Sequence, residues 1–192
     1  MSTPLSYAIV DVVGQPFLAV WRPEDGAVCA AGFLAQPATG AEPAAPVTTP
    51  TTPTSDPLWE RLTKSDPELA ARGLADHPTT SGAIPEALAA YAAGNLQAID
   101  TLRVGQRETP FRGEVWRALR SVPAGDSVTY SKLAALAGRP AAVRAAASGC
   151  ATNLVALVVP CHRIVRADGG LGGYLFGTEV KHRLLRHEGA VA

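Results

Sequence analysis

Residues 127–151 read SVTYSKLAALAGRPAAVRAAASGCA, and this stretch decides the fold of the second half of the chain. Its first part has the apolar spacing of a short helix and stops at Gly138, and Pro140 opens a second helix. Two short helices joined by a tight turn containing glycine are the outline of a helix-turn-helix. The second helix is nearly all alanine around Arg144. That composition suits insertion into a DNA groove and equally suits close packing against another helix.

A helix on each side completes this half of the chain. Residues 109–122 predict an amphipathic helix whose apolar side chains share one face, namely Phe111, Val115, Leu119 and Val122. Residues 178–189 predict another amphipathic helix, and its last turn carries Glu188. We therefore expect a mostly α-helical C-terminal domain over residues 107–192.

The first half of the chain begins with β structure. Three short β-rich runs are separated by turn-forming sequences, at residues 6–13, 16–21 and 27–35. They predict a three-stranded antiparallel meander. Helical spacing and one more extended segment follow, at residues 57–73, 84–94 and 96–104, with Pro67 breaking the first helix into two pieces. The fold class predicted for residues 1–106 is thus an α/β domain, an antiparallel sheet plus helices.

Residues 36–57 differ from their surroundings in composition. They hold six prolines and almost no large apolar side chain. Such a stretch buries too little surface to offset the entropy lost on ordering. We expect a mobile Pro/Thr/Ala-rich surface insertion.

The charge is divided between the two halves. The formal net charge of the 192 residues is zero, yet residues 1–106 carry a net charge of −6 and residues 107–192 a net charge of +6. A basic half is typical of a protein that binds a phosphate backbone. An uneven distribution between two ordinary domains would look the same, so charge alone does not decide.

Composition excludes several classes of protein. No apolar run reaches the length of a membrane-spanning helix, and the N-terminus lacks the basic start and apolar stretch of a secretory signal. Three scattered cysteines are too few for a disulfide framework or a four-ligand zinc site. We expect a soluble cytoplasmic protein with no metal site and no membrane partner.

The strongest chemical signal is Pro160-Cys161-His162-Arg163, which interrupts a buried-strand pattern over residues 154–165. A cysteine in apolar surroundings is most often an unreactive buried side chain. Here an imidazole and a guanidinium follow at once, and both favour a thiolate. Neighbouring residues on a strand point to opposite faces, so a direct contact of His162 with the sulfur requires a turn or a bridging water. The glycine-rich segment 167–177 that follows predicts a sharply turning loop around Tyr174.

These residues resemble a known family. The run from Pro160 to Val165 is similar to the signature of the O6-alkylguanine-DNA alkyltransferases, also called methylated-DNA–protein-cysteine methyltransferases. Further matches occur in the family's order across residues 109–190, at Phe111, Val115-Trp116, Val122-Pro123, Gly125-Asp126, Thr129-Tyr130-Ser131, Asn153, Gly173-Tyr174, Lys181, Leu184-Leu185 and Glu188-Gly189. For the first half, the resemblance implies only a ribonuclease-H-like outline. For the second half, it implies a winged-helix-like domain.

The resemblance assigns catalytic roles to five residues. Cys161 would accept the alkyl group of O6-alkylguanine, and of O4-alkylthymine, in an in-line displacement. His162 would act as general base through a water, with Glu188 orienting its imidazole. Asn153 would brace the active-site turn. Tyr130 would donate a hydrogen bond or proton to the departing guanine.

Further residues would bind DNA and the extruded base. The resemblance implies that Arg144 fills the gap left in the base stack. The other DNA contacts that we expect are Thr129, Ala142 and Arg163. The expected substrate pocket consists of Val165, Gly173, Tyr174, Leu175 and Phe176. Phe176 stands where many relatives have glycine, so its ring would narrow the pocket for bulky alkyl groups.

The chemistry implies a single-use protein. A thioether does not leave under physiological conditions, so each chain would act once, as a monomer, on double-stranded DNA that carries the lesion. No cofactor is expected, because the lesion supplies the alkyl group. Three rival classes stay open: a helix-turn-helix regulator, a lesion-recognition module without transfer, and a cysteine hydrolase. Cys161 argues against the first two, and a hydrolase gives the Arg144 helix no purpose.

Overall fold

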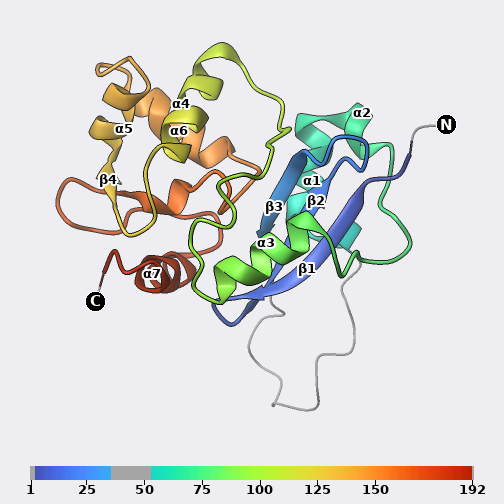
Figure 1. Cartoon of the computed structure of the whole chain (residues 1–192). Helices are drawn as coiled ribbons and strands as arrows, with labels where there is room; N and C mark the ends of the chain where they lie inside the picture. Colours follow the sequence, from blue (N-terminus) through green and yellow to red (C-terminus); the bar gives the residue numbers. More distant parts are fainter. Residues whose placement is uncertain (1–2, 36–52, 192) are drawn as a thin grey trace.

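The computed structural model of the protein describes residues 3–35 and 53–191. Its chain opens with a three-stranded antiparallel sheet in the order β1-β2-β3 (Figure 1). The strands are β1 (Ser6–Val12), β2 (Gln15–Trp21) and β3 (Val28–Phe33). Residue Ala8 faces Ala19 across the first pair, and Ala19 faces Ala31 across the second. The predicted meander is confirmed.

Three α-helices of the first half cover the sheet. They are α1 (Pro57–Ser65), α2 (Pro67–Ala70) and α3 (Ala83–Ala92). Helix α1 packs against β3, and α3 packs against β1. Pro67 does break the helical run, because Asp66 both ends α1 and caps α2 with its side chain. No helix within the described residues is long and apolar enough to cross a membrane.

The predicted insertion over residues 36–57 lies mostly outside the described residues. Its last part is described and is ordered: Pro53–Ser55 form a short 3-10 helix, and Pro57 begins α1. Asp56 is buried, and its carboxylate accepts hydrogen bonds from the backbone N–H groups of Leu58 (2.8 Å) and Ala35 (3.0 Å). The prediction therefore extended the insertion about one turn too far.

The extended segment predicted over residues 96–104 is found only at its end, where Val104 pairs with Val28 of β3, whereas residues 96–101 form turns. Successive turns are closed by backbone bonds from Ala98, Asp100 and Leu102 to the carbonyl three residues before each. Turning places Ile99 and Leu102 in the core together, which an extended chain could not do for residues three apart.

The second half is mostly helical. Its elements are α4 (Pro110–Arg120), β4 (Val128–Thr129), α5 (Tyr130–Leu136), α6 (Val143–Thr152), a 3-10 helix (Cys161–Arg163), β5 (Ile164–Val165) and α7 (Thr178–His187). Helices α5 and α6 pack together and against α4. Gly138 turns the chain between α5 and α6 with a φ of 76°. Helix α6 begins three residues after Pro140, because residues 139–142 form a turn of their own.

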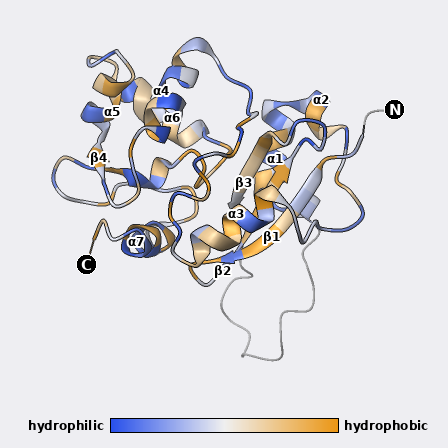
Figure 2. Cartoon of the chain, in the orientation of Figure 1, coloured by the Kyte–Doolittle hydropathy of each residue, from blue (hydrophilic) through white to orange (hydrophobic). Residues whose placement is uncertain are grey.

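Residues 154–160 correct the buried-strand prediction. They form turns, and Leu157 adopts a left-handed φ of 65°. One short stretch pairs with the sheet: Ala31 donates to the carbonyl of Leu154 (2.8 Å), and Ala156 donates to Ala31 (2.9 Å). The two halves thus share one continuous hydrophobic core, and the hydrophobic colouring of the strands in Figure 2 marks its N-terminal part.

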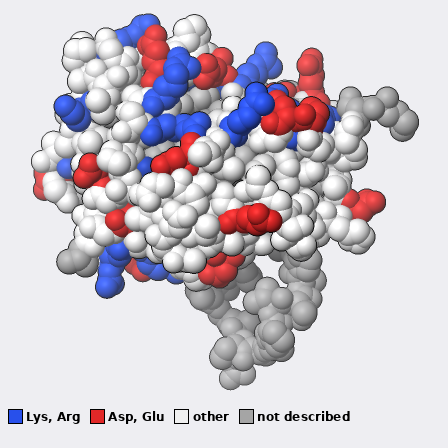
Figure 3. All heavy atoms as spheres, in the orientation of Figure 1, with Lys and Arg blue, Asp and Glu red and all other residues white. Residues whose placement is uncertain are grey.

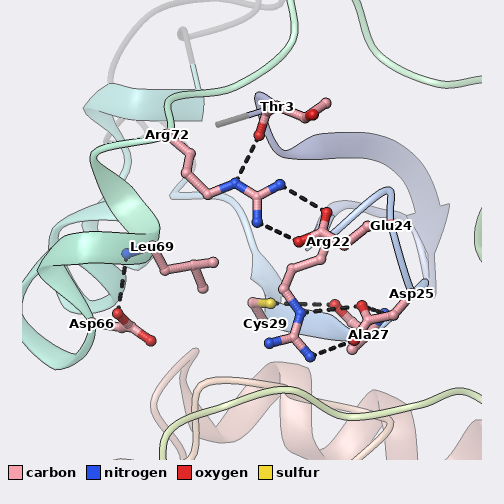
Figure 4. Close-up of polar contacts among 9 residues, drawn as sticks. All are labelled: Thr3, Arg22, Glu24, Asp25, Ala27, Cys29, Asp66, Leu69 and Arg72. Atoms are coloured by element: carbon pink, nitrogen blue, oxygen red, sulfur yellow. Dashed lines mark hydrogen bonds and ion pairs between the residues drawn. The ribbon is translucent and has the colours of Figure 1, made fainter. Parts of the chain in front are cut away.

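Charged side chains follow the division seen in the sequence. On the face drawn in Figure 3, basic side chains gather mainly over the half that carries α4 to α7. In the first half, arginines pair with carboxylates near Cys29 (Figure 4). Arg72 pairs with Glu24 at 2.6 Å, and Arg22 pairs with Asp25 at 2.7 Å. The Arg72–Glu24 pair joins the turn between β2 and β3 to the chain just after α2, and the Arg22–Asp25 pair lies within that turn.

Candidate active site

Cys161 lies at the start of the 3-10 helix that follows Pro160. Its partly buried side chain borders a cavity of about 280 Å³. The other walls come from α6, from the first residue of α5 and from the glycine-rich loop, including Tyr130, Cys150, Asn153, Tyr174 and Phe176. A turn rather than a strand therefore presents the sulfur to the cavity.

The buried Asn153 holds this turn in place. Its side-chain N–H donates to the carbonyl of Val159 (2.8 Å) and to the Cys161 sulfur (3.4 Å). Its side-chain oxygen accepts from the backbone of Val155 (3.0 Å) and from the Gln106 amide (3.1 Å). The bracing predicted for Asn153 agrees with these contacts, and Gln106 is a supporting residue that the sequence did not reveal.

His162 and Glu188 are both fully buried and in contact. Nε2 of His162 lies 3.0 Å from Oε1 of Glu188. A carboxylate can only accept, so Nε2 carries the proton and Nδ1 is left as the basic nitrogen. Nδ1 is buried and has no hydrogen-bond partner among the described residues. The imidazole is therefore oriented by Glu188 and holds one nitrogen ready to accept a proton.

Glu188 also binds two other side chains. Arg163 donates to both carboxylate oxygens (2.8 and 2.9 Å), and the Tyr91 hydroxyl donates to Oε1 (2.8 Å). Arg163 is only 2% exposed and also donates to the carbonyl of Val122. The prediction that Arg163 binds DNA is thus wrong, because its charge is taken up inside the protein.

The surroundings set the acidity of the His162–Glu188 pair. Burial lowers the pKa of His162, and the hydrogen bond to Glu188 only partly offsets this, so the imidazole is neutral at neutral pH. Burial alone would raise the pKa of Glu188, but hydrogen bonds from His162 and Arg163 hold it well below its usual range. A neutral imidazole beside a charged carboxylate is the state that a general base requires.

The thiol of Cys161 experiences opposing influences. Burial raises its pKa, while the Asn153 hydrogen bond and the positive charges of Lys181 and Arg61 lower it. Lys181 is fully buried, and its ammonium group donates to the carbonyls of Ile164 and Leu171. It thereby ties β5 to the glycine-rich loop. The sequence placed Lys181 in a motif but assigned it no role.

The other three predicted DNA-binding residues lie on α6 or directly before α5 and α6. Arg144 is exposed on the first turn of α6. Residues Arg144, Ala147 and Ala151 share one helix face, and the last two line the cavity. Thr129 caps α5 through a bond from the Lys132 N–H (3.2 Å), and Ala142 is the residue before α6. Arg144 is therefore an exposed cation on the face of α6 that borders the cavity.

Four of the five predicted pocket residues line the cavity, namely Gly173, Tyr174, Leu175 and Phe176. Val165 does not, because it pairs with Thr129 in the short parallel sheet of β4 and β5. The Phe176 ring packs edge-on against Phe33 of β3 at a centroid distance of 5.6 Å. A Cβ on Gly32 would lie 2.4 Å from this ring, so glycine is required there.

Within residues 3–35 and 53–191, no cluster of three or more His, Cys, Asp or Glu side chains could bind a metal ion.

The fold and the site define a class of protein with a cysteine and an imidazole–carboxylate pair beneath a pocket that opens next to two packed helices. Within that class, residues 110–190 match the model of the family described as 6-O-methylguanine DNA methyltransferase, DNA binding domain.

A comparison with curated proteins agrees with this match. The chain is 48% identical over 111 residues to the methylated-DNA–protein-cysteine methyltransferase of Salmonella typhimurium. That alignment covers 58% of this chain and 65% of the relative, so the chain spans about two thirds of the length of this curated relative.

Two solved structures share the overall fold, a mixed α/β protein with a small antiparallel sheet and helices. Mycobacterium tuberculosis OGT in complex with DNA has a TM-score of 0.67 and 27% identity, covering 96% of this chain and 93% of that one. The O6-methylguanine-DNA methyltransferase of Pyrococcus kodakaraensis has a TM-score of 0.62 and 26% identity, covering 96% and 99%.

Proposed function

We propose that the protein repairs DNA by transferring the alkyl group of O6-alkylguanine, and of O4-alkylthymine, to its own Cys161. The observation that carries this proposal is the cavity in which the Cys161 sulfur lies beneath the helix pair, with a neutral imidazole and a charged carboxylate behind it. The cavity has a volume of about 280 Å³ and mostly apolar walls, which suits one small ligand such as a flipped base.

The transfer breaks one bond and forms one. The Cys161 proton passes through a water to Nδ1 of His162, and the thiolate attacks the alkyl carbon. A carbon–sulfur bond forms as the carbon–oxygen bond to guanine breaks, and the electron pair leaves with the base. Tyr130 supplies the proton or hydrogen bond that the departing guanine needs; burial raises its pKa, so its hydroxyl remains protonated. The products are an S-alkyl cysteine and guanine, and no cofactor takes part.

The helix pair would deliver the base. Arg144 is exposed above the cavity and would occupy the space that the extruded nucleotide leaves in the duplex. Thr129 and Ala142, at the starts of α5 and α6, would contact the backbone. The net charge of +6 on residues 107–192 favours this partner.

The proposal also covers the division of the chain into domains, its oligomeric state and its location. We infer a division into domains at residues 106 and 107, with a ribonuclease-H-like first domain and a winged-helix-like second domain. The meander backed by helices and the β4–β5 pair beside α5 support these assignments. We also infer that the protein acts as a monomer and lies in the cytoplasm, where it would have access to DNA.

One experiment separates this function from its rivals. A duplex carrying O6-methylguanine is incubated with excess protein, and the DNA, the small molecules and the protein are analysed separately. We expect guanine to be restored and the methyl group to remain on the protein. Release of methanol would indicate a cysteine hydrolase. An intact lesion would indicate a regulator or a recognition module.

A further inference from the structure

Arg61 is a cation of the first half of the chain whose guanidinium reaches the active-site turn. It lies on α1, and its Nη2 donates to the carbonyl of Ala151 (2.8 Å) and approaches that of Asn153 (3.4 Å). These carbonyls lie at the C-terminal end of α6. A helix C-terminus carries partial negative charge and favours a cation. Arg61 therefore joins α1 to the residues that hold Cys161.

The charge of Arg61 is not taken up by an acid. Among the described residues it forms no ion pair with a carboxylate, and its two acceptors are neutral carbonyls. The side chain is half-buried and borders a second cavity of about 330 Å³, of which Leu175 and Phe176 of the pocket loop form another wall. An unpaired cation in partly buried surroundings acts on nearby groups more strongly than one in water.

The charge of Arg61 acts on the Cys161 thiol. Arg61 lowers the pKa of this thiol, and Cys161 in turn raises that of Arg61 against the effect of burial. The other titratable or charged groups that act on Cys161, or on which it acts, are Cys150, Tyr130, Tyr174 and Lys181. Of these, only Lys181 is also a cation, and it is held by the loop and β5.

We propose that Arg61 is a positioning residue for the transfer reaction: it fixes the end of α6 and the Asn153 turn, and its charge favours the thiolate form of Cys161. The inference rests on the proposed function, since it concerns the same nucleophile. It gives the sheet half of the chain a part in the chemistry, through α1.

The test measures the thiol directly, without DNA. The rate at which iodoacetamide modifies Cys161 is followed by peptide mass across neutral to alkaline pH. Arg61→Gln removes the charge, and Arg61→Lys keeps it. Arg120→Gln is the matched control, because Arg120 also donates to two backbone carbonyls across the two halves, those of Asp100 (2.6 Å) and Leu102 (3.0 Å).

We expect Arg61→Gln to react about 3- to 10-fold more slowly at neutral pH, with an unchanged rate on the alkaline plateau. Arg61→Lys and Arg120→Gln should follow the wild-type profile. If Arg61→Gln does not fold, Arg61→Met keeps the apolar stem and replaces it.

Three outcomes would overturn the proposal: an unshifted profile in Arg61→Gln, an equal loss of rate at every pH, or a lysine variant as slow as the glutamine variant. If the wild-type protein takes no methyl group from DNA, the proposed function is contradicted but the Arg61 proposal is not, because the thiol profile is measured without DNA.

Discussion

Two cysteines of this chain, the buried Cys29 and the partly buried Cys161, have arginines nearby, and their surroundings differ in a way that bears on function. Cys29 in β3 is 0% exposed, and its thiol donates to the carbonyl of Ala27 (3.2 Å). The arginines near it, Arg22 and Arg72, are paired with Asp25 and Glu24 (Figure 4). Burial raises the pKa of this thiol to about 11.

Cys161 has the opposite arrangement. It accepts a hydrogen bond from Asn153, and the cations that act on it are bound to neutral carbonyls rather than to acids. It also faces an open cavity and stands next to a neutral imidazole. Burial and a nearby arginine are common to both cysteines and do not distinguish them. The two differ in what the arginines bind, and in whether the sulfur donates or accepts a hydrogen bond.

The largest expected effect is a loss of stability when the carboxylate near Cys161 is removed, compared with the carboxylate near Cys29. Glu188→Ala leaves His162, Arg163 and Tyr91 buried without their acceptor, so we expect a loss of about 3–5 kcal/mol in the free energy of unfolding. Glu24→Ala removes an exposed partner of Arg72 and should cost far less. Urea unfolding of both variants measures this, and equal losses would contradict the account.

The amide that faces the sulfur should matter next. Asn153→Ala removes the bonds to Val159 and Cys161, and we expect alkyl transfer to slow by about 10- to 100-fold. Gln106→Ala leaves those two bonds in place and serves as the matched control, with a smaller loss. Single-turnover rates with methylated duplex measure both. A larger loss of rate in Gln106→Ala than in Asn153→Ala would show that the bonds of Asn153 to Val159 and Cys161 are not the contacts that matter most.

Arg144 should affect duplex DNA alone. Arg144→Ala should slow repair of duplex DNA by about 10-fold, because extruding a base costs a few kcal/mol, and should leave transfer from the free base unchanged. Arg117→Ala removes another exposed arginine, paired with Glu108, and controls for lost net charge. Equal losses on both substrates would mean that Arg144 does not support base extrusion.

Phe176 should limit the size of the alkyl group. Its ring lies between Phe33 and Tyr174 and borders the cavity, so Phe176→Gly should increase inhibition by free benzylated guanine several-fold, while methyl transfer is retained. Inhibition curves for wild type and variant measure this. High sensitivity already present in the wild type would remove the steric explanation.

The smallest expected effect is a change in the pH dependence of stability. The pKa of His162 is lowered by folding from 6.5, so the unfolded chain binds more protons as the pH falls below that value. Stability is fully present above pH 6.5 and declines as the pH drops toward the folded pKa. His162→Gln should flatten this part of the curve, followed by urea unfolding at several pH values. A variant that keeps the wild-type slope there would show that another group is responsible.

The sequence predicted local features better than interactions across the chain. The meander, the break at Pro67 and most helices depend on local signals such as turn residues and apolar spacing. The turn over residues 154–160 could not be predicted, because Gln106 and the edge of β3, which contact Asn153, Leu154 and Ala156, are distant in the sequence. The burial of Arg163 was missed for the same reason, since Glu188 lies 25 residues away along the chain.

The sequence motif identified the site residues that lie close together in the chain. Cys161, His162 and the loop around Tyr174 carry a pattern of their own. Tyr91 and Arg61 come from the first half, where they look like ordinary residues of amphipathic helices. Only the packing of the two halves brings them to the site.

The most direct test of the account is the position and number of alkyl groups on the chain. Wild-type protein is incubated with excess duplex carrying O6-methylguanine, and each cysteine peptide is analysed by mass. We expect one methyl group per chain on Cys161, none on Cys29 or Cys150, and no transfer in Cys161→Ala. A methyl group on Cys29 or Cys150, or repair of several lesions by one chain, would contradict the account.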